Sequence, residues 1–294
     1  MPKIAYKTHN FHKKSLELYV HIDEIISDYA AAGYTLTLRQ LYYQLVSKDL
    51  LENNDKNYKK IGDIVKNGRL AGLIDWSVIE DRSRGFNNIS QWDTPADIIK
   101  SAADSYHRDL WADQNYYLEI WVEKQALESI IERAATRLDV QSFACKGFPS
   151  ITALWEAVHY RYETITEQGR KVVILYLGDH DPSGLNMDNT NLEHIKTFSD
   201  SCPYIDFKRI ALTREQIELY EPPPNPAKIT DTRAAGYIAK YGPYSWELDA
   251  LRPEILDGLI TDEIKMYLDQ KKYNAAIDQQ ETERKQIEGL KKYL

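Results

Sequence analysis

Residues 171–184 read KVVILYLGDHDPSG, and this stretch decides the fold class. After its leading lysine, the run VVILYL is apolar without alternation, as expected for a strand buried on both faces of a parallel sheet. The segments on either side alternate between strand-like and helix-like patterns, which is typical of βαβ units. The sequence therefore predicts an α/β fold built on a parallel sheet.

The strand and helix patterns around that stretch extend the prediction in both directions. Strands are expected at YYLEIWVE (116–123) and VQSFAC (140–145), and helices at 124–138, 150–169 and within 191–198. Pro182 and Gly184 are expected to end the central strand in a sharp turn. EPPPNP (221–226) predicts a loop or linker, because proline cannot continue a helix or a central strand. Residues 253–294 are helical in pattern and rich in charge, which predicts a solvated helix pair.

The N-terminal part has a different pattern, with helices first. Apolar residues recur with a helical period over residues 11–31, and Thr37 is placed to cap a second helix, LRQLYYQLVSKDL. A third helix is expected at 58–70. WSVIEDRSRGF (76–86) mixes β-branched residues with charge and glycine, as a short strand pair with an exposed tip does. Three helices followed by a small ribbon indicate a winged helix at about residues 11–90.

Acidic side chains follow two of the predicted strands. Asp179 and Asp181 come directly after KVVILYLG, and Glu123 ends YYLEIWVE. Ligands bind beyond the carboxyl ends of strands in open α/β sheets, so three carboxylates converge if the two strands are neighbours. Such a cluster requires a cation, and hard oxygen ligands select Mg²⁺, or Mn²⁺ in its place. The same Asp-x-Asp pattern also occurs in sugar-nucleotide enzymes and phosphatases, and His180 between the aspartates is interpreted as a packed or loop residue.

Composition indicates a cytoplasmic protein without a membrane segment. The N-terminal MPKIAYKTHNFHKK lacks an apolar signal core, and no stretch approaches the apolar length of a membrane span. Cys145 and Cys202 are interpreted as two reduced thiols. The net charge of −8 disfavours tight, sequence-independent binding to nucleic acid, but basic residues gather in Lys56–Arg69 and Arg82–Arg84.

Four motifs resemble one known family. WVEKQAL (121–127), KGFPSITAL (146–154), ILYLGDHDPSGL (174–185) and YSWELDAL (244–251) occur in the order seen in the Toprim domain of topoisomerase VI A subunits. The meiotic double-strand-break protein and the Wadjet-type nuclease subunits share that arrangement. In this family a winged helix precedes Toprim and carries a nucleophilic tyrosine in an Arg-x-x-Tyr-Tyr pattern. Arg39, Tyr42 and Tyr43 match it, so the resemblance covers about residues 36–253 and points to a short member of the phage or mobile-element type.

The resemblance implies a division of the chain into four parts. It places a winged-helix DNA-binding domain at 1–93, a connecting helix at 94–116, a Rossmann-like Toprim metal-binding domain at 117–252 and a helical extension at 253–294. It also implies a homodimer with a groove for double-stranded DNA. No ATP-site motif appears in the sequence, so strand passage would require a separate ATPase subunit.

The resemblance further implies a reaction, DNA strand cleavage. Tyr43 would attack a DNA phosphate and stay joined to the 5′ end, with Arg39 stabilising the phenolate or the phosphate. Magnesium at Glu123, Asp179 and Asp181, supplied by the other subunit of a dimer, would hold the phosphate. Tyr42 is expected to pack in the core instead.

Further charged residues are candidate supports of this site: Lys124, Lys146, Arg82, Arg84, Glu247 and Asp249. The two lysines follow the metal-bearing strands and the two arginines lie in the predicted wing, where both kinds can contact phosphate. The two acidic residues either back the metal site or form the first turn of a helix.

Two other functions stay open. The same metal site can serve a plain nuclease in which water is the nucleophile. A non-catalytic DNA-binding subunit is the third option, favoured by the acidic net charge and by Ala153, where the family often has arginine after the threonine. The sequence carries no base-reading or 2′-hydroxyl signature, so DNA and RNA both remain open as substrates.

Overall fold

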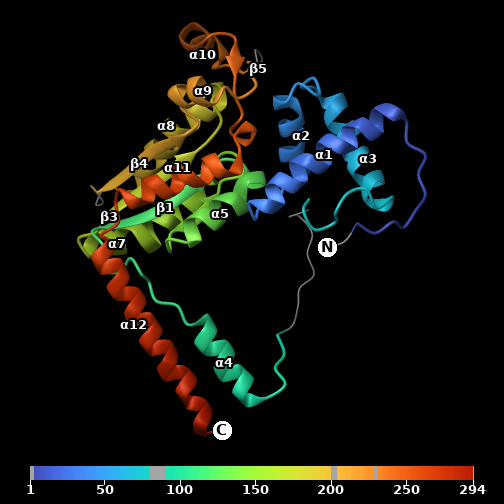
Figure 1. The fold of residues 1–294 in the computed structure, drawn as a ribbon. Coiled ribbons are helices and arrows are strands. Elements are labelled where there is room, and N and C mark those ends of the chain that lie inside the picture. The colour runs from blue at the N-terminus through green and yellow to red at the C-terminus, as the bar shows by residue number, and fades with distance from the viewer. Residues whose placement is uncertain (1–2, 80–89, 200–203, 228–230, 294) are drawn as a thin grey trace.

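The computed structural model describes residues 3–79, 90–199, 204–227 and 231–293. Over these ranges the chain has an α/β fold with one four-stranded parallel sheet, a group of helices before it and helices at the C-terminal end (Figure 1). The α/β class predicted from the sequence is therefore confirmed. Arg82, Arg84 and most of the ribbon expected at 76–86 lie outside the described residues, as does Cys202.

The N-terminal helices pack around a core of their own. They are α1 (Lys13–Ala31), α2 (Leu38–Ser47) and α3 (Asp55–Leu70). Helix α2 begins as predicted, because the Thr37 side chain accepts from the Gln40 backbone and the Gln40 side chain accepts from Thr37 N at 2.8 Å. Apolar side chains of all three helices fill this core, among them Ile22, Leu41 and Ile61.

The sheet has the strand order β2-β1-β3-β4, and all neighbours are parallel. Its strands are β1 (Tyr116–Val122), β2 (Gln141–Ala144), β3 (Lys171–Leu177) and β4 (Ile205–Ala211). The run predicted to be buried on both faces is β3, which lies between β1 and β4. Because β1 and β3 are direct neighbours, the condition for bringing their carboxyl-end residues together is met.

Helices cover both faces of the sheet. Helices α5 (Glu128–Thr136) and α11 (Pro253–Lys265) pack on the face that buries Val173 and Leu175. The opposite face is covered by α6 (Ile151–Ala157), a π-helical turn η2 (Val158–Tyr162) and α8 (Pro182–Phe198). The single helix expected at 150–169 is thus divided into α6, η2 and α7 (Glu163–Glu167).

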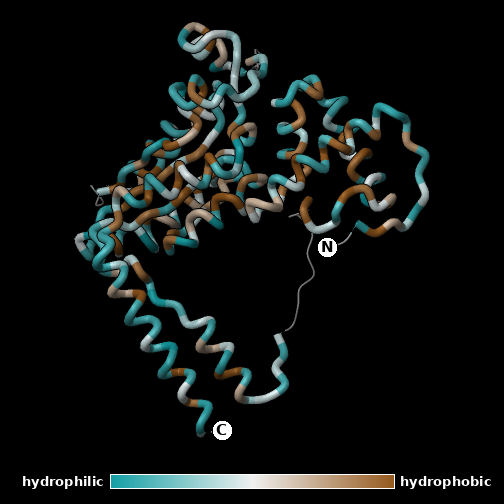
Figure 2. The backbone as a smooth tube through the Cα atoms, in the orientation of Figure 1, coloured by the Kyte–Doolittle hydropathy of each residue, from teal (hydrophilic) through white to brown (hydrophobic). Residues whose placement is uncertain are grey.

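The C-terminal segment is only partly the solvated pair that its charge predicts. Helix α11 is part of the sheet's core, with Leu256, Ile260 and Ile264 fully buried, so this half of the prediction is wrong. The sequence misleads here because α11 also carries charged residues, of which Asp262 and Lys265 are exposed whereas Asp257 is buried. Helix α12 (Gln270–Glu288) is mostly polar (Figure 2), although Tyr273 near its start is buried, and it runs beside α4 (Pro95–Ser105), which begins after Thr94 as predicted.

The remaining elements are short. They are listed in chain order: η1 (Gln125–Leu127), α9 (Arg214–Tyr220), β5 (Asn225–Pro226), α10 (Ala234–Tyr241), β6 (Tyr244–Ser245), η3 (Leu248–Ala250) and η4 (Gly289–Tyr293). The predicted loop at 221–226 is irregular except for β5, which pairs antiparallel with β6. Throughout the described ranges, each helix is too short or too polar to act as a membrane span.

Candidate functional site

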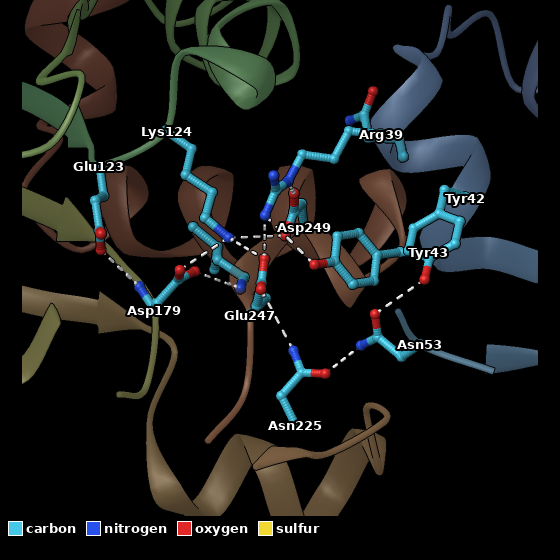
Figure 3. A network of polar contacts seen from close by, with 12 residues as sticks. Arg39, Tyr42, Tyr43, Asn53, Glu123, Lys124, Asp179, Asn225, Glu247 and Asp249 are labelled. Carbon is cyan, nitrogen blue, oxygen red and sulfur yellow. Dashed lines mark hydrogen bonds and ion pairs between the residues drawn. The ribbon is translucent and has the colours of Figure 1, made fainter. Parts of the chain in front are cut away.

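The carboxyl ends of β1 and β3 bring the first two predicted site residues together (Figure 3). Glu123 follows β1 directly, and its Oε2 accepts a hydrogen bond from the backbone N–H of Asp179 at 2.9 Å. The ladder continues to this point, since Glu123 N donates to Leu177 O at 2.9 Å. The strand pairing itself therefore fixes the distance between these residues.

The loop after β3 leads straight into a helix. Asp181 is the residue before α8, and its Oδ1 accepts from Gly184 N at 2.6 Å. Pro182 occupies the first turn of α8, where its missing N–H costs nothing. A side chain at Gly184 would put Cβ 2.3 Å from Asp179 O, so only glycine fits. The predicted turn is thus a helix start, and Pro182 and Gly184 form its first turn instead of ending the strand.

Arg209, on β4, contacts the loop between β3 and α8 through hydrogen bonds and an ion pair. Its guanidinium pairs with Asp188 at 2.5 Å and donates to the carbonyl oxygens of Gly178 at 2.8 Å and Gly184 at 2.9 Å. Sequence reasoning missed this residue. The available signal was an arginine inside IDFKRIA, a strand of a sheet with two covered faces, where an unneutralised cation is expensive.

The YSWELDAL motif is attached to the same loop. His180 and Trp246 form an antiparallel bridge with N···O distances of 2.9 and 3.0 Å, and Leu248 N donates to Asp179 Oδ1 at 2.8 Å. The His180 ring packs near Trp246 and Tyr237, and burial lowers its pKa to about 4. His180 is therefore a packed neutral residue, in agreement with the sequence prediction.

Lys124 lies at the centre of the carboxylates. Its Nζ is 2.8 Å from Asp179, 2.7 Å from Glu247 and 2.9 Å from Asp249. Burial would lower the pKa of Lys124, but these carboxylates raise it well above the usual value, so the ammonium stays charged. The predicted phosphate contact of Lys124 is thus replaced in this structure by carboxylate contacts. Lys146 is exposed and does not line the cavity described below.

Arg39 connects the N-terminal helices to this cluster. Its Nη2 is 2.6 Å from Glu247 and its Nε is 2.8 Å from Asp249, while Nη2 also donates to the Tyr43 hydroxyl at 3.3 Å. Glu247 and Asp249 therefore act as partners of Lys124 and Arg39, and Asp249 also lies in the turn η3. Burial raises the pKa of Tyr43, and the charges of Glu247 and Asp249 raise it further, against the opposing effect of Arg39.

The Tyr42 hydroxyl bonds to the backbone and to the first of two hydrogen-bonded asparagine side chains. Its hydroxyl accepts from Asn54 N at 2.7 Å and donates to Asn53 Oδ1 at 3.1 Å. Asn53 in turn donates to Asn225, and Asn225 Nδ2 donates to Glu247 Oε1 at 3.3 Å. Tyr42 is therefore a structural residue, as predicted, and the two asparagines form a second bridge between the two parts of the chain.

Together these residues enclose a cavity of about 550 Å³ between α2 and the sheet, which we call the acidic cavity. Its lining includes residues from both parts of the chain: Arg39, Tyr42, Tyr43, Asn53, Tyr58, Glu123, Lys124, Asp179, Asp181, Asn225 and Glu247. The predicted nucleophile and the three predicted metal ligands thus lie around one space. The resemblance implied that a second subunit supplies the metal, whereas here a single chain brings both sets together.

The donor set has the chemistry of a site for a hard divalent cation. Carboxylates outnumber cations among the described lining residues, and burial, with Glu123 and Asp249 as negative neighbours, raises the pKa of Asp179 to about 7 against the opposing Lys124. As they stand, the described residues include no group of histidine, cysteine or carboxylate ligands gathered closely enough to hold a metal. The Lys124 ammonium takes the place of a cation at Asp179. Magnesium would be held by Glu123, Asp179 and Asp181.

Comparison with known proteins adds no assignment. No protein-family model matches the chain, and no curated protein has a matching sequence.

Proposed function

We propose that this chain is a magnesium-dependent DNA-cleaving enzyme similar to topoisomerase VI A subunits. In this proposal residues 1–93 are a winged helix and residues 117–252 a Toprim domain. The observation that carries the proposal is that Tyr43 lines the same cavity as Glu123, Asp179 and Asp181. The order of the four sequence motifs supports it independently.

In the proposed reaction the Tyr43 hydroxyl oxygen attacks the phosphorus of one DNA phosphodiester. The bond from phosphorus to O3′ breaks as the bond to tyrosine forms, which leaves a 5′-phosphotyrosyl link and a free 3′-hydroxyl. The phenolic proton is lost to solvent and O3′ takes up a proton, so charge and atoms balance. Arg39, 3.3 Å from the hydroxyl, favours the phenolate form.

In the proposed complex the carboxylates and Lys124 face the phosphate from the side opposite Tyr43. When bound, magnesium supplies positive charge that stabilises the phosphoryl oxygens in the transition state. Glu123 is oriented by the Asp179 N–H at 2.9 Å, and Arg209 keeps the loop carbonyls in place. The chain's own part is therefore to hold oxygen ligands rigidly beside the nucleophile.

A second candidate is a nuclease in which water attacks and the metal site is unchanged. The observation that favours it is the environment of Tyr43, whose pKa is raised by burial and by Glu247 and Asp249. A phenol that loses its proton with difficulty is a weaker nucleophile at neutral pH. The two candidates share the carboxylates and differ only in the need for Tyr43.

Tyrosine variants separate these functions. Labelled duplex DNA is incubated with magnesium and with wild type, Tyr43→Phe, Tyr42→Phe or Asp179→Asn, and the products are resolved on denaturing gels. The proposal expects cleavage by wild type and Tyr42→Phe, and none by Tyr43→Phe or Asp179→Asn. Cleavage by Tyr43→Phe but not by Asp179→Asn would establish the water mechanism, and the absence of any cleavage by wild type would favour a binding subunit.

The proposed partners follow from the same resemblance. Double-stranded DNA is the substrate, two chains form a homodimer around it, and a separate ATPase subunit would be required for strand passage. Arg39 and the Asn53–Asn225 pair cross the acidic cavity, so both bridges must open for a duplex to enter. Sedimentation of the protein with and without duplex tests the dimer.

A further inference from the structure

A second cavity adjoins the acidic cavity and differs from it in character. It measures about 600 Å³ and lies between α3, the start of α2 and the turn η1. We call it the apolar cavity, and its described lining residues are Thr37, Leu38, Arg39, Tyr58, Gly62, Val65, Lys66, Arg69, Leu70, Trp76, Ile79, Gln125 and Ala126. Arg39 and Tyr58 line both cavities, so the two spaces are neighbours that share these two side chains.

The charges around the apolar cavity are all of one sign among its described lining residues. Arg39, Lys66 and Arg69 are cations, and no described carboxylate lines the space. This is unusual for a protein with a net charge of −8, and it is the reverse of the acidic cavity. Arg39 already pairs with Glu247 and Asp249, and Lys66 lies 3.4 Å from the exposed Asp63. Arg69, with Lys66 beside it, therefore supplies the positive charge that would complement an anionic ligand here.

Arg69 carries an unused hydrogen-bond donor at this place. Its Nη2 donates to Trp76 O at 3.0 Å and to Ile79 O, and its guanidinium carbon lies 5.3 Å from the centre of the Trp76 ring. Its Nε is buried and has no hydrogen-bond partner among the residues that the structure describes. Buried donors in folded proteins are nearly always paired, so Arg69 has donor capacity that the described residues leave unused.

The rest of the lining suits a flat, partly apolar group. Trp76 and Tyr58 supply aromatic surface, and Leu38, Val65 and Ile79 supply aliphatic surface. The volume falls within the range of about 300–1,000 Å³ that small-ligand pockets occupy. Aromatic rings with nearby arginine and lysine are the features that bind single nucleotides, because the bases stack and the phosphates pair.

We propose that the apolar cavity binds one unstacked nucleoside phosphate unit of the DNA strand that is cleaved. The base lies among Trp76, Tyr58 and the aliphatic side chains, and its phosphate faces Arg69 and Lys66. The proposal rests on the proposed function for the identity of the strand. Arg39 and Tyr58 border both cavities, so the phosphate at Tyr43 and this base would lie in neighbouring spaces.

A cavity-filling variant tests the proposal without any cleavage. Gly62 lies in α3 on the cavity wall, and a Cβ there would meet only Leu38 at 3.5 Å, which is ordinary contact. Gly62→Leu therefore fills the space while improving helix propensity. The matched control is Gly236→Leu in α10, where an added Cβ meets no described atom within 4 Å.

Binding is measured by fluorescence anisotropy in EDTA, with labelled oligonucleotides that carry one abasic site at successive positions. For wild type and Gly236→Leu, we expect an abasic site at one position to weaken binding by roughly 5- to 100-fold, the effect of losing one stacked base. Gly62→Leu should bind the intact strand that much more weakly and lose the penalty for the abasic site. Trp76→Ala should behave in the same way.

Two results would overturn the inference. If Gly62→Leu binds like wild type, or keeps the full abasic penalty, no base occupies the cavity. The binding assay contains no metal, so either of these results leaves the cleavage proposal intact. Conversely, loss of cleavage in both Tyr42→Phe and Tyr43→Phe would leave the result of the binding assay intact. If labelled dAMP binds wild type and not Gly62→Leu, while no abasic position weakens binding of the strand to wild type, the ligand is a free nucleotide and the strand is excluded.

Discussion

Replacing Lys124 by methionine is the substitution whose effect on the free energy of unfolding follows most directly from the structure. The ammonium lies within 2.9 Å of carboxylate oxygens of Asp179, Glu247 and Asp249. Arg39 still neutralises the last two, but Asp179 loses its only ion-pair partner among the described residues while its side chain is 10% exposed. Breaking a buried pair by removing one member costs about 3–5 kcal/mol, which is the expected loss in the free energy of unfolding.

The pH dependence of that loss has a defined sign. Burial raises the pKa of Asp179 from 3.8 to about 7, so the folded protein binds this proton more tightly than the unfolded chain does. Lys124 opposes this rise in wild type, so the pKa of Asp179 in the variant lies higher still. Protonation removes the unpaired charge, so the deficit of the variant is largest above that higher pKa and shrinks as the pH falls toward 7. Added magnesium at a hundredfold excess over its dissociation constant should stabilise the variant by about 2.7 kcal/mol. It should stabilise wild type less, because there Lys124 competes with the metal for Asp179.

Urea unfolding at pH 6 and pH 8, with EDTA or magnesium, measures all of these terms. Lys146→Met is the matched control, because Lys146 is exposed outside the acidic cavity. With a slope of about 3 kcal/mol per molar urea, the variant's midpoint at pH 8 in EDTA should fall by about 1 M or more. A fall no larger than that of the control, or equal magnesium effects on wild type and variant, would refute this account of Lys124.

Three further predictions concern residues of the same site. Tyr42→Phe should lower the free energy of unfolding by about 1 kcal/mol and retain cleavage, since its hydroxyl bonds only to Asn54 N and the Asn53 side chain among the contacts described above; loss of cleavage on gels would contradict this. Gly184→Ala should destabilise by about 1–3 kcal/mol in thermal unfolding, because its Cβ would lie 2.3 Å from Asp179 O, and an unchanged midpoint would refute the close approach. Burial alone would raise the pKa of Glu247, but Lys124 and Arg39 lower it from 4.5 to about 2, so stability should be lost as the pH falls through this window. Urea unfolding measured at a series of pH values should show a loss of up to about 3 kcal/mol in the free energy of unfolding of wild type. The free energy of unfolding of Glu247→Gln should depend less on pH in this window.

The positions and ends of the strands are the parts of this molecule that the sequence predicts well. The apolar run at 171–177 identifies the central strand, and residues directly after two parallel neighbours must lie at the same edge. Glu123 and Asp179 were found for that reason. Tyr43 and Arg39 were found by resemblance alone, because helical periodicity does not distinguish a packed tyrosine from one that lines a cavity.

Contacts between distant parts of the chain were beyond the sequence pattern. Arg39 meets Glu247 and Asp249 only because α2 packs beside the sheet, and no local spacing encodes that distance. The contacts of Lys124 with Glu247 and Asp249 were unpredicted for a similar reason, since these partners come from a segment more than a hundred residues later. Arg209 left a readable sign, a cation in a covered strand, whereas Asn225 left none.

The most direct test of the central claim is to look for protein covalently attached to DNA. Duplex labelled on the strand 3′ of the break is incubated with the protein and magnesium, denatured, digested and analysed by mass spectrometry. The account predicts a nucleotide joined through 5′-phosphate to the peptide that contains Tyr43, absent in Tyr43→Phe and in EDTA. Cleaved DNA with no label retained on protein would contradict it and assign the attack to water.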